Sequence, residues 1–203
     1  KLKPGQKIGA DNFVTGDSTY IISWTTTLWT LPGNAALAAG PKITYEILTL
    51  KNGEVFIFAK DLKESVNIES EKLNSEFISG KNLIGLEYEP LFDAPQLSAK
   101  GGSPPDGRAG ASGGKSKTSY KVYAADFVNT EEGTGVVHIA PMYGVDDFNL
   151  SAAAGLPRAH TVDPEGKFIG GFGAGLKGVL VKSLQSENLI IEYLKNNGNL
   201  LRI

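Results

Sequence analysis

The sequence predicts a mixed α/β protein with a β-barrel core and flanking helices. Apolar segments with strand character recur along the chain, two or three helical segments lie between them, and 25 of the 203 residues are glycine. So many glycines favour frequent turns, which a β-rich fold requires. The strands are spaced too unevenly for a doubly wound parallel sheet. We expect residues 1–203 to form a single domain of this class.

A β-hairpin is the clearest local prediction. Residues 43–50 alternate apolar and polar side chains, residues 55–59 are apolar, and Asn52-Gly53 between them is a strong hairpin-turn signal. Apolar runs predict further strands at residues 20–24, 83–88, 120–125 and 135–139.

Four helical or turn segments are expected as well. Residues 62–77 are charged and moderately amphipathic, and they predict a helix. Residues 35–39 follow a Pro-Gly-Asn sequence and predict a short helix or turn, and residues 147–154 predict a helix. Residues 186–197 predict the last helix, because two apolar residues share one face and a glycine follows its end. These are Ile190, Leu194 and Gly198.

Residues 98–119 are rich in glycine, serine and proline and lack large apolar side chains. Such a segment buries too little surface to offset the entropy of ordering, so we expect a mobile surface insertion. Gly-Lys-Ser at positions 114–116 suggests a phosphate-binding loop, but that motif requires a glycine at position 109, where Ala109 stands. We therefore expect no ATP site and no aminoacylation activity.

Composition excludes several classes of function. The net charge is −2, which does not suit a basic nucleic-acid-binding surface, so we expect this domain alone to hold RNA weakly. The chain has no cysteine and two histidines, which excludes thiol nucleophiles, thiolate zinc sites and multi-histidine metal centres. We expect neither metal nor cofactor. No signal peptide or membrane-length apolar run is present, and no initiator methionine begins the chain, so we expect a cytoplasmic fragment of a longer protein.

Two polar segments carry the functional signal. The first, residues 24–34, reads Trp-Thr-Thr-Thr-Leu-Trp-Thr-Leu-Pro-Gly-Asn and is called the threonine-rich peptide below. Its hydroxyls and amide suit a site that binds a polar, uncharged group or orders a water molecule. The second, residues 133–148, reads Gly-Thr-Gly-Val-Val-His-Ile-Ala-Pro-Met-Tyr-Gly-Val-Asp-Asp-Phe and is called the second motif.

Both segments resemble signatures of isoleucyl-tRNA synthetase editing domains, in the family's order. The family pattern of the first is Trp-Thr-Thr-Thr-Pro-Trp-Thr-Leu-Pro-Ala-Asn, and valyl and leucyl relatives carry arginine where Thr27 stands. Residues 83–92 also resemble a family segment, so the resemblance covers nearly the whole chain. Two departures from the family pattern stand out. Leu28 stands in place of a proline and therefore has a backbone N–H donor. Gly33 stands in place of an alanine and loosens the turn.

The resemblance implies a hydrolytic proofreading domain, a double-sieve device for which isoleucyl-tRNA synthetase is the standard example. Its substrate would be valine attached to the 3′ end of tRNA(Ile), with valyl-adenylate as a further substrate and the rest of the synthetase chain as partner. The implied mechanism is metal-free ester hydrolysis. The expected catalytic residues are Thr25, Thr26, Thr27 and Asp147, and the expected substrate-binding residues are Thr30, Asn34, His138 and Asp146.

Each of these residues also has a structural interpretation. Asp147 would bind the substrate α-ammonium, yet an aspartate is also favoured in the first turn of a helix, and we assign Asp146 mainly to capping. His138 would border the amino-acid pocket, or it is a core histidine. Any one threonine reflects β-propensity, and Asn34 suits a left-handed turn. The tryptophans, Trp24 and Trp29, are expected to pack rather than to stack on bases.

Two other functions remain open from the sequence. The chain would be a non-catalytic module that binds tRNA or adenylate, or an editing domain of valyl or leucyl type. A valyl-adenosine analogue that binds without turnover would support the first, and a panel of misacylated tRNAs would test the second.

Overall fold

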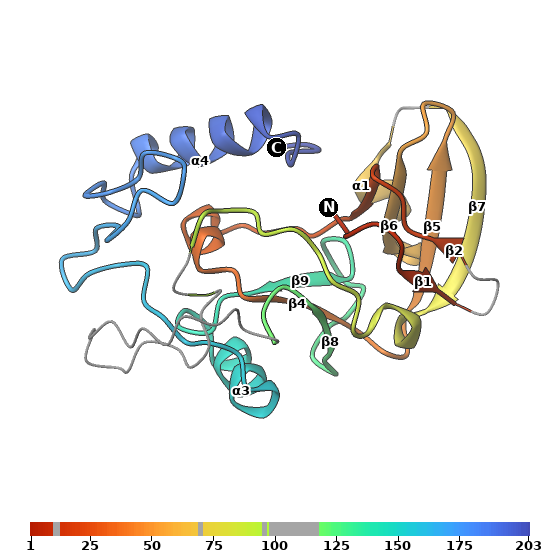
Figure 1. The fold of residues 1–203 in the computed structure, drawn as a ribbon, viewed down its shortest axis with the longest axis horizontal. Coiled ribbons are helices and arrows are strands. Elements are labelled where there is room, and N and C mark those ends of the chain that lie inside the picture. Colours follow the sequence, from red (N-terminus) through yellow and green to blue (C-terminus); the bar gives the residue numbers. More distant parts are fainter. Residues whose placement is uncertain (10–12, 69–70, 95–96, 98–117) are drawn as a thin grey trace. The chain divides into compact units, whose positions relative to one another are not determined.

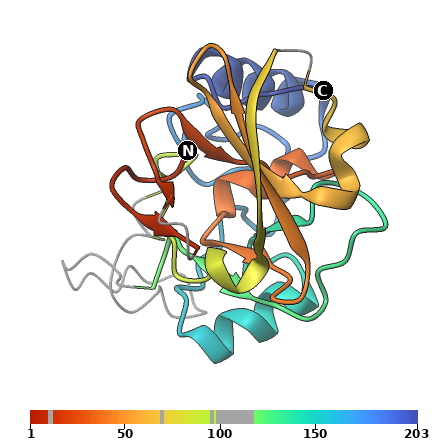
Figure 2. The ribbon, with the colours of Figure 1, turned by 90° about the vertical axis from the view of Figure 1, so that its right-hand side faces the viewer.

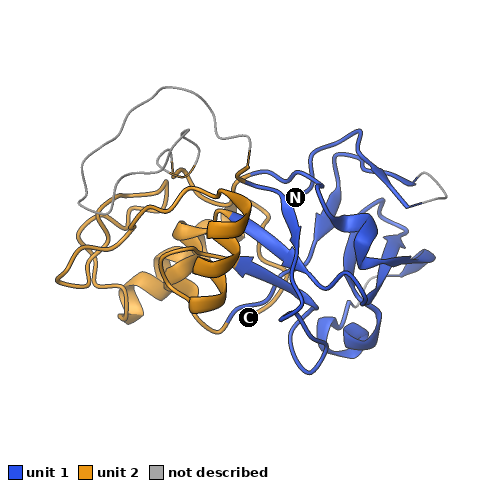
Figure 3. Cartoon of the chain, turned by 90° about the horizontal axis from the view of Figure 1, so that it is seen from below, with its two compact units in different colours: residues 1–25, 36–89, 120–138 blue, residues 26–35, 90–119, 139–203 orange. Residues whose placement is uncertain are grey.

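A computed structural model describes residues 1–9, 13–68, 71–94, 97 and 118–203. The chain divides into two compact units (Figure 3). Unit 1 consists of Lys1–Thr25, Ala36–Glu89 and Tyr120–His138, and unit 2 of Thr26–Ala35, Pro90–Ser119 and Ile139–Ile203. The single domain over residues 1–203 stays a prediction, and the predicted insertion lies outside the described residues except for Thr118 and Ser119.

Unit 1 contains a four-stranded sheet in the order β3-β6-β5-β7. Figure 2 shows the long yellow strand β7 beside the orange strand β5. The predicted hairpin is confirmed, with β5 antiparallel to β6 and Gly53 at φ +88° in the turn. The predicted strand at residues 20–24 is confirmed in its first part. The strands are β3 (Thr19–Ile21), β5 (Thr44–Leu50), β6 (Val55–Ala59) and β7 (Lys72–Ser79).

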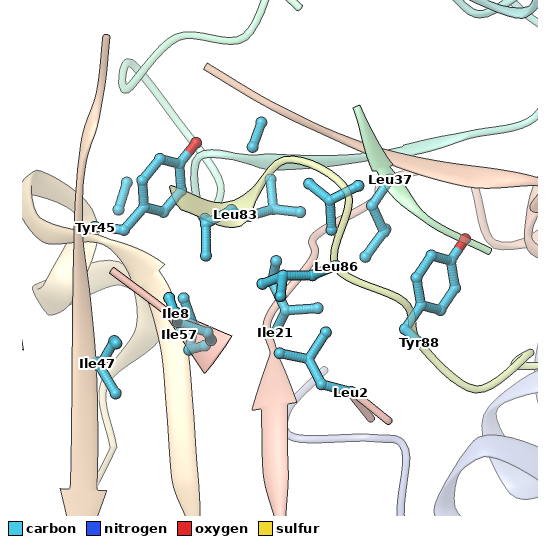
Figure 4. Packing of buried hydrophobic residues seen from close by; sticks show 14 of the residues in the cluster. Leu2, Ile8, Ile21, Leu37, Tyr45, Ile47, Ile57, Leu83, Leu86 and Tyr88 are labelled. Atoms are coloured by element: carbon cyan, nitrogen blue, oxygen red, sulfur yellow. The ribbon is translucent and has the colours of Figure 1, made fainter. Parts of the chain in front are cut away.

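The two central strands of this sheet, β5 and β6, are largely buried on both faces, and their alternate side chains point to opposite sides. One face belongs to the main core, in which Tyr45, Ile47 and Ile57 are at most 1 % exposed (Figure 4). The other face holds a second apolar cluster that includes Leu48 and Phe58. β-branched and aromatic residues stabilise such strands through this two-sided packing.

A second sheet in unit 1 has the strand order β8-β4-β9. Its strands are β4 (Ala36–Ala39), β8 (Val122–Ala124) and β9 (Val136–Ile139); the last residue of β9 belongs to unit 2. The strands predicted at residues 120–125 and 135–139 are therefore confirmed. The helix or turn predicted at residues 35–39 is wrong. Because β4 is fully buried between two partner strands, its pairing overrides the helix preference of alanine.

The helix predicted over residues 62–77 is also largely wrong. The segment begins with a short helix, η2 (Lys60–Leu62) followed by α1 (Lys63–Val66), which ends where Asn67 adopts a left-handed conformation at φ 42°. The chain then forms β7, which pairs along the whole length of β5. Pairing with a distant strand overrides the local preference of the glutamate and lysine residues.

The strand predicted at residues 83–88 is wrong as well. A short 3-10 helix, η3 (Gly80–Leu83), begins this segment, and Gly85 follows at φ +88°. After this interruption the segment makes only isolated bridges, Glu87 with Lys121 and Leu2 with Tyr88. A two-stranded ribbon, β1 (Lys7–Ile8) and β2 (Phe13–Val14), completes unit 1.

Unit 2 contains the 3-10 helix η1 (Leu28–Gly33) and the helices α3 (Val145–Ala154) and α4 (Leu184–Asn196). Helix α4 packs against η1 (Figure 1). Both predicted long helices are confirmed. Ile190 and Leu194 are buried on one face of α4, and Gly198 follows its end at φ +65°.

The mixed α/β class is thus confirmed, and the β-barrel core is not. The described residues form three separate sheets, of four, three and two strands, and no closed barrel. Within the described part of the chain, no helix is long and apolar enough to cross a membrane.

Candidate functional site

The threonine-rich peptide is largely helical, despite the β-propensity of its threonines. Residues Leu28–Gly33 form η1, and Thr27 precedes it with an irregular backbone at φ −126° and ψ 78°. Leu28 therefore occupies the first helical position. Proline, the family residue there, is well suited to that position because its missing N–H has no helical partner to lose.

The threonine side chains differ in their surroundings. Thr30 is 7 % exposed, and its hydroxyl donates to the carbonyl of Thr27 at 2.9 Å, so it stabilises the start of η1. Thr26 and Thr27 are exposed, and Thr25 is half-buried. Thr26 and Thr27 are thus accessible to a ligand, while Thr30 shapes the peptide that carries them.

Asn34 ends the peptide in a buried, extended conformation, with φ −60° and ψ 118°. The alternative of a left-handed turn residue is therefore wrong. Its N–H donates to the carbonyl of Leu31 at 3.0 Å. The next residue, Ala35, donates its N–H to the carbonyl of Ile139 at 2.8 Å, which ties the peptide to the second motif within unit 2.

The second motif continues through a tight turn into α3. Tyr143 donates its N–H to the carbonyl of Ala140 at 2.9 Å, with Pro141 at the turn position that favours proline. Ala140 in turn donates its own N–H to Oδ1 of Asp147 at 2.6 Å. Asp147 lies in the first turn of α3, where the helix dipole favours a carboxylate. Turn and helix are thus joined through the Asp147 side chain.

At Gly144, the residue before α3, the carboxylate of Asp147 occupies the space that a side chain would need. A β-carbon on Gly144 would lie 2.4 Å from Oδ2 of Asp147, closer than any real contact. A larger residue at position 144 would therefore displace the carboxylate.

The ionisation of Asp147 is set by opposing effects. Burial raises the pKa of the carboxyl above its ordinary value, the backbone N–H groups of Ala140 and Asp147 lower it, and the neighbouring charge of Asp146 raises it. The pKa is raised overall. Asp146 itself is exposed in the first turn of the same helix. The N-cap is Gly144, without a side-chain capping bond, so the capping role predicted for Asp146 is wrong, and its effect on Asp147 is electrostatic.

Tyr143 is a residue that the sequence patterns did not single out. Its ring contacts Trp29 edge to face at a centroid distance of 5.1 Å. Its hydroxyl accepts the N–H of Thr161 and shares a second hydrogen bond with Oγ1 of Thr161, both at 2.7 Å. Tyr143 could have been considered because it lies within the second motif. Nothing in the sequence singled out Thr161.

The predicted site residues are distributed over both units. Thr25 and His138 lie in unit 1 and the other six in unit 2. His138 is half-buried in β9, its Nδ1 atom is inaccessible, and burial lowers the pKa of the imidazole to about 4. The side chain is therefore neutral at pH 7. Residues of unit 2 that flank the Ile139–Ala140 peptide form the most closely connected part of the candidate site.

The two tryptophans differ in exposure. Trp29 is half-buried against Tyr143, in agreement with its predicted packing role. Trp24 is 46 % exposed, although it bridges to Val137 and its ring covers Gly133. Packing therefore accounts for only part of the Trp24 side chain.

Known proteins resemble the chain over nearly its full length. It is 39 % identical over 186 residues to an isoleucine–tRNA ligase of Clostridium novyi, a match that covers 92 % of the chain and 16 % of that protein. A second isoleucine–tRNA ligase, of Clostridium acetobutylicum, shows the same identity and coverage. One of Treponema pallidum is 37 % identical over 185 residues, which cover 91 % of the chain and 16 % of that protein. No protein-family model matches the chain.

The chain is thus a relative of the aminoacyl-tRNA ligases. More narrowly, it is related to one segment of the isoleucine–tRNA ligases, and it spans about a sixth of the length of these relatives. The resemblance to isoleucyl-tRNA synthetases that the two motifs predicted is confirmed.

Solved structures resemble the chain more weakly. A leucyl-tRNA synthetase CP1 segment, GlLeuRS-CP1, has a TM-score of 0.47 at 19 % identity and covers 66 % of this chain and 44 % of its own. The editing domain of the P. falciparum cytosolic leucyl-tRNA synthetase has a TM-score of 0.45 at 15 % identity, with 64 % and 44 % covered.

Proposed function

We propose that this chain is a proofreading hydrolase that removes valine wrongly attached to tRNA(Ile), with the 3′ end of that tRNA and the remainder of a synthetase as its partners. One observation carries the proposal. Consecutive residues anchor both functional segments: Ile139 accepts the N–H of Ala35, which directly follows the threonine-rich peptide, and Ala140 donates to the carboxylate of Asp147. The Ile139–Ala140 peptide thereby holds both the polar side chains that would bind a ribose or a water and the carboxylate that would bind an amino group.

In the proposed reaction, water attacks the carbonyl carbon of the aminoacyl ester. The bond between that carbon and the ribose oxygen breaks, and the products are free valine and a tRNA with a free terminal hydroxyl. Asp147 binds the α-ammonium group of the substrate. A carboxylate has about four acceptor positions, so the bond from Ala140 leaves capacity for the ammonium.

Thr26 and Thr27 supply exposed hydroxyls that orient the ester and the attacking water, and Thr25 is assigned to the same task. Asn34 is assigned to the adenosine or amino-acid end of the substrate. Positioning of this kind contributes most of the rate in a reaction without a metal or covalent intermediate. Thr30 supports the peptide from its buried position. Asp146 tunes the pKa of Asp147.

We assign His138 to the wall of the amino-acid pocket, where it helps to exclude isoleucine. An imidazole with a pKa of about 4 is a weak base at neutral pH, which argues against a role as general base. A pocket wall of fixed size is needed because one methylene alone discriminates by only about 1–3 kcal/mol.

The test is a deacylation assay with Val-tRNA(Ile) and Ile-tRNA(Ile) as substrates. Release of valine with Ile-tRNA(Ile) spared supports the proposal, and equal hydrolysis of both contradicts the size selection. Titration with a non-hydrolysable valyl-adenosine analogue distinguishes a binding module, which binds without turnover. Faster deacylation of a valyl- or leucyl-type misacylated tRNA would assign the chain to a different editing class.

A further inference from the structure

We propose that Tyr143 is a positioning residue that holds the threonine-rich peptide in its active geometry through a paired contact with Gly33. This inference rests on the proposed function, because the effect of the contact is expressed through the hydrolytic reaction. The pairing begins with the backbone of η1. A β-carbon on Gly33 would lie 3.0 Å from Cε2 of Tyr143 and 3.7 Å from the β-carbon of Ala140.

The Tyr143 ring thus occupies the space that a side chain at position 33 would need. Gly33 does not have a positive φ, so an alanine there would meet no backbone strain, only the ring. Gly33 replaces the alanine of the family pattern, and the ring contact gives this departure a physical meaning. The small residue permits the aromatic ring to pack closely on η1.

Contacts of the Tyr143 ring with Trp29 and of its hydroxyl with Thr161 restrict movement of the ring away from Gly33. Trp29, also in η1, meets it edge to face. The Tyr143 hydroxyl accepts the N–H of Thr161, a residue with no exposed surface, and also bonds its Oγ1. A β-carbon at position 33 would push the ring by a few tenths of an ångström, which strains its hydrogen bonds to the buried Thr161.

Tyr143 also connects η1 to the carboxylate of Asp147. Its backbone N–H closes the turn on Ala140, and Ala140 holds Asp147. A shift of the ring would therefore move the threonine-rich peptide against Asp147. Since the reaction depends on placing the ester between hydroxyls and carboxylate, a small shift lowers kcat more than it raises KM.

A double-mutant cycle on the 203-residue chain tests the pairing. The variants are Gly33→Ala, Tyr143→Leu and the combination, and each is measured for kcat and KM on Val-tRNA(Ile). We expect each single change to lower kcat about tenfold and to change KM less than about threefold. The fold-loss of kcat in the double variant should be far smaller than the product of the two single fold-losses. The leucine retracts from position 33 and leaves space for the new methyl group.

Amide hydrogen exchange gives a second readout that does not depend on activity. Exchange of the Asn34 and Ala35 amides should quicken in Gly33→Ala and recover in the double variant, since both amides hold the peptide in place. Tyr143→Phe, which keeps the ring, should retain more kcat than Tyr143→Leu. Gly171→Ala is the control, because a β-carbon there meets nothing within 4 Å. If Tyr143→Leu does not fold, Tyr143→His replaces it, because its smaller ring also retracts.

Independent, multiplicative losses in kcat overturn the pairing, as does an exchange rate of Asn34 that is equal in all variants. A wild-type chain that releases no valine refutes the proposed function instead. In that case the exchange cycle alone decides whether Tyr143 positions the peptide.

Discussion

Oδ1 of Asp147 accepts the backbone N–H of Ala140 at 2.6 Å. This bond joins the tight turn after β9 to the first turn of α3, and it fixes the carboxylate at a helix N-terminus. The structural and the functional interpretations of Asp147 are therefore compatible. One oxygen position stabilises the fold, and acceptor capacity remains for the ammonium group of the proposed substrate.

Replacement of Asp147 by asparagine separates these two roles. The amide oxygen can still accept the N–H of Ala140, so we expect the fold to be retained. The charge that binds the substrate ammonium is lost. A hydrogen bond to a charged group is worth about 1.5–3 kcal/mol, so kcat/KM should fall by about 10- to 150-fold. Deacylation of Val-tRNA(Ile) measures the effect.

Asp146→Asn is the matched control, because Asp146 is adjacent, acidic and exposed. It should keep most of the activity at neutral pH. A loss in Asp146→Asn as large as in Asp147→Asn would refute the assignment of the ammonium site to Asp147.

The activity should fall at acidic pH through protonation of Asp147. Burial, with a contribution from Asp146, raises its pKa above the ordinary value of 3.8. The active carboxylate is therefore lost as pH falls, at a pH above that of an unperturbed aspartate. Since removing the charge of Asp146 lowers the pKa of Asp147, the acid limb of the kcat/KM profile should move to lower pH in Asp146→Asn. An unmoved limb would show that another group controls it.

Protonation of Asp147 should change folding stability in the opposite direction to its effect on activity. A carboxyl with a raised pKa in the folded state binds its proton more tightly than in the unfolded state. Its ionisation therefore costs stability at neutral pH, and this cost is relieved as pH falls through the folded pKa. Activity and stability should thus respond to Asp147 protonation in opposite directions.

Elements that are encoded by local sequence signals could be predicted, and strands that depend on pairing with distant segments could not. Asn52 and Gly53 predicted their hairpin because the turn is encoded by those residues themselves. Asp147 could be placed at a helix start for the same reason. Ala36–Ala39 is a strand only because β8 and β9 flank it, and four alanine-rich residues carry no signal of these partners. Strand β7 likewise depends on β5.

The features of the candidate site also fall into those that local sequence predicts and those that depend on distant contacts. The threonines, Asn34 and Asp147 could be proposed as site residues because each of the two motifs is contiguous in sequence. The contact of Tyr143 with η1 could not be predicted, because it depends on the absence of a β-carbon at Gly33, in a different motif. The helical form of η1 was missed because threonine-rich sequence favours strands, whereas Leu31 and Pro32 are buried in this peptide and α4 packs against it.

His138 should make the chain less stable at mildly acidic pH. Burial lowers its pKa from 6.5 to about 4, so the unfolded state takes up the proton first as pH falls. The stability associated with neutral His138 is present above pH 6.5 and is lost between about pH 6.5 and 4. Its size is at most about 3 kcal/mol, because the side chain is only partly buried by area.

Urea unfolding at several pH values measures this effect. His138→Gln should flatten the change in unfolding free energy between pH 6.5 and 4, while His160→Gln, at an exposed position, should leave it as in the wild type. Equal pH profiles for all three proteins would contradict the assignment.

Glu46 should stabilise unit 1 through a buried hydrogen-bonded charge. Its side chain is 1 % exposed, and Oε1 accepts from Lys63, Lys72 and Ser75. Burial alone would raise the pKa of Glu46, but the bonds from Ser75, Lys63 and Lys72 lower it overall. This stability is therefore present at neutral pH and is lost as pH falls through the lowered pKa.

We expect Glu46→Gln to lower the free energy of unfolding by about 1–3 kcal/mol at pH 7, because the amide cannot replace the charge. Glu71→Gln, which breaks an exposed ion pair with Lys51, should cost less than about 1 kcal/mol. Denaturant unfolding compares the two, and equal costs would refute the importance of burial at Glu46.

Leu28→Pro should stabilise the threonine-rich peptide. Leu28 is the first residue of η1, and Thr27 before it lies outside the α-helical region that a following proline disfavours, at φ −126° and ψ 78°. Proline reduces the freedom of the unfolded chain, so the free energy of unfolding should rise by about 0.4–1 kcal/mol. Leu31→Pro is the contrasting variant: position 31 is inside η1 and buried, so it should destabilise by about 3 kcal/mol. If Leu28→Pro also destabilises, the backbone at Thr27 and Leu28 depends on leucine, and the family's proline would require a different peptide geometry.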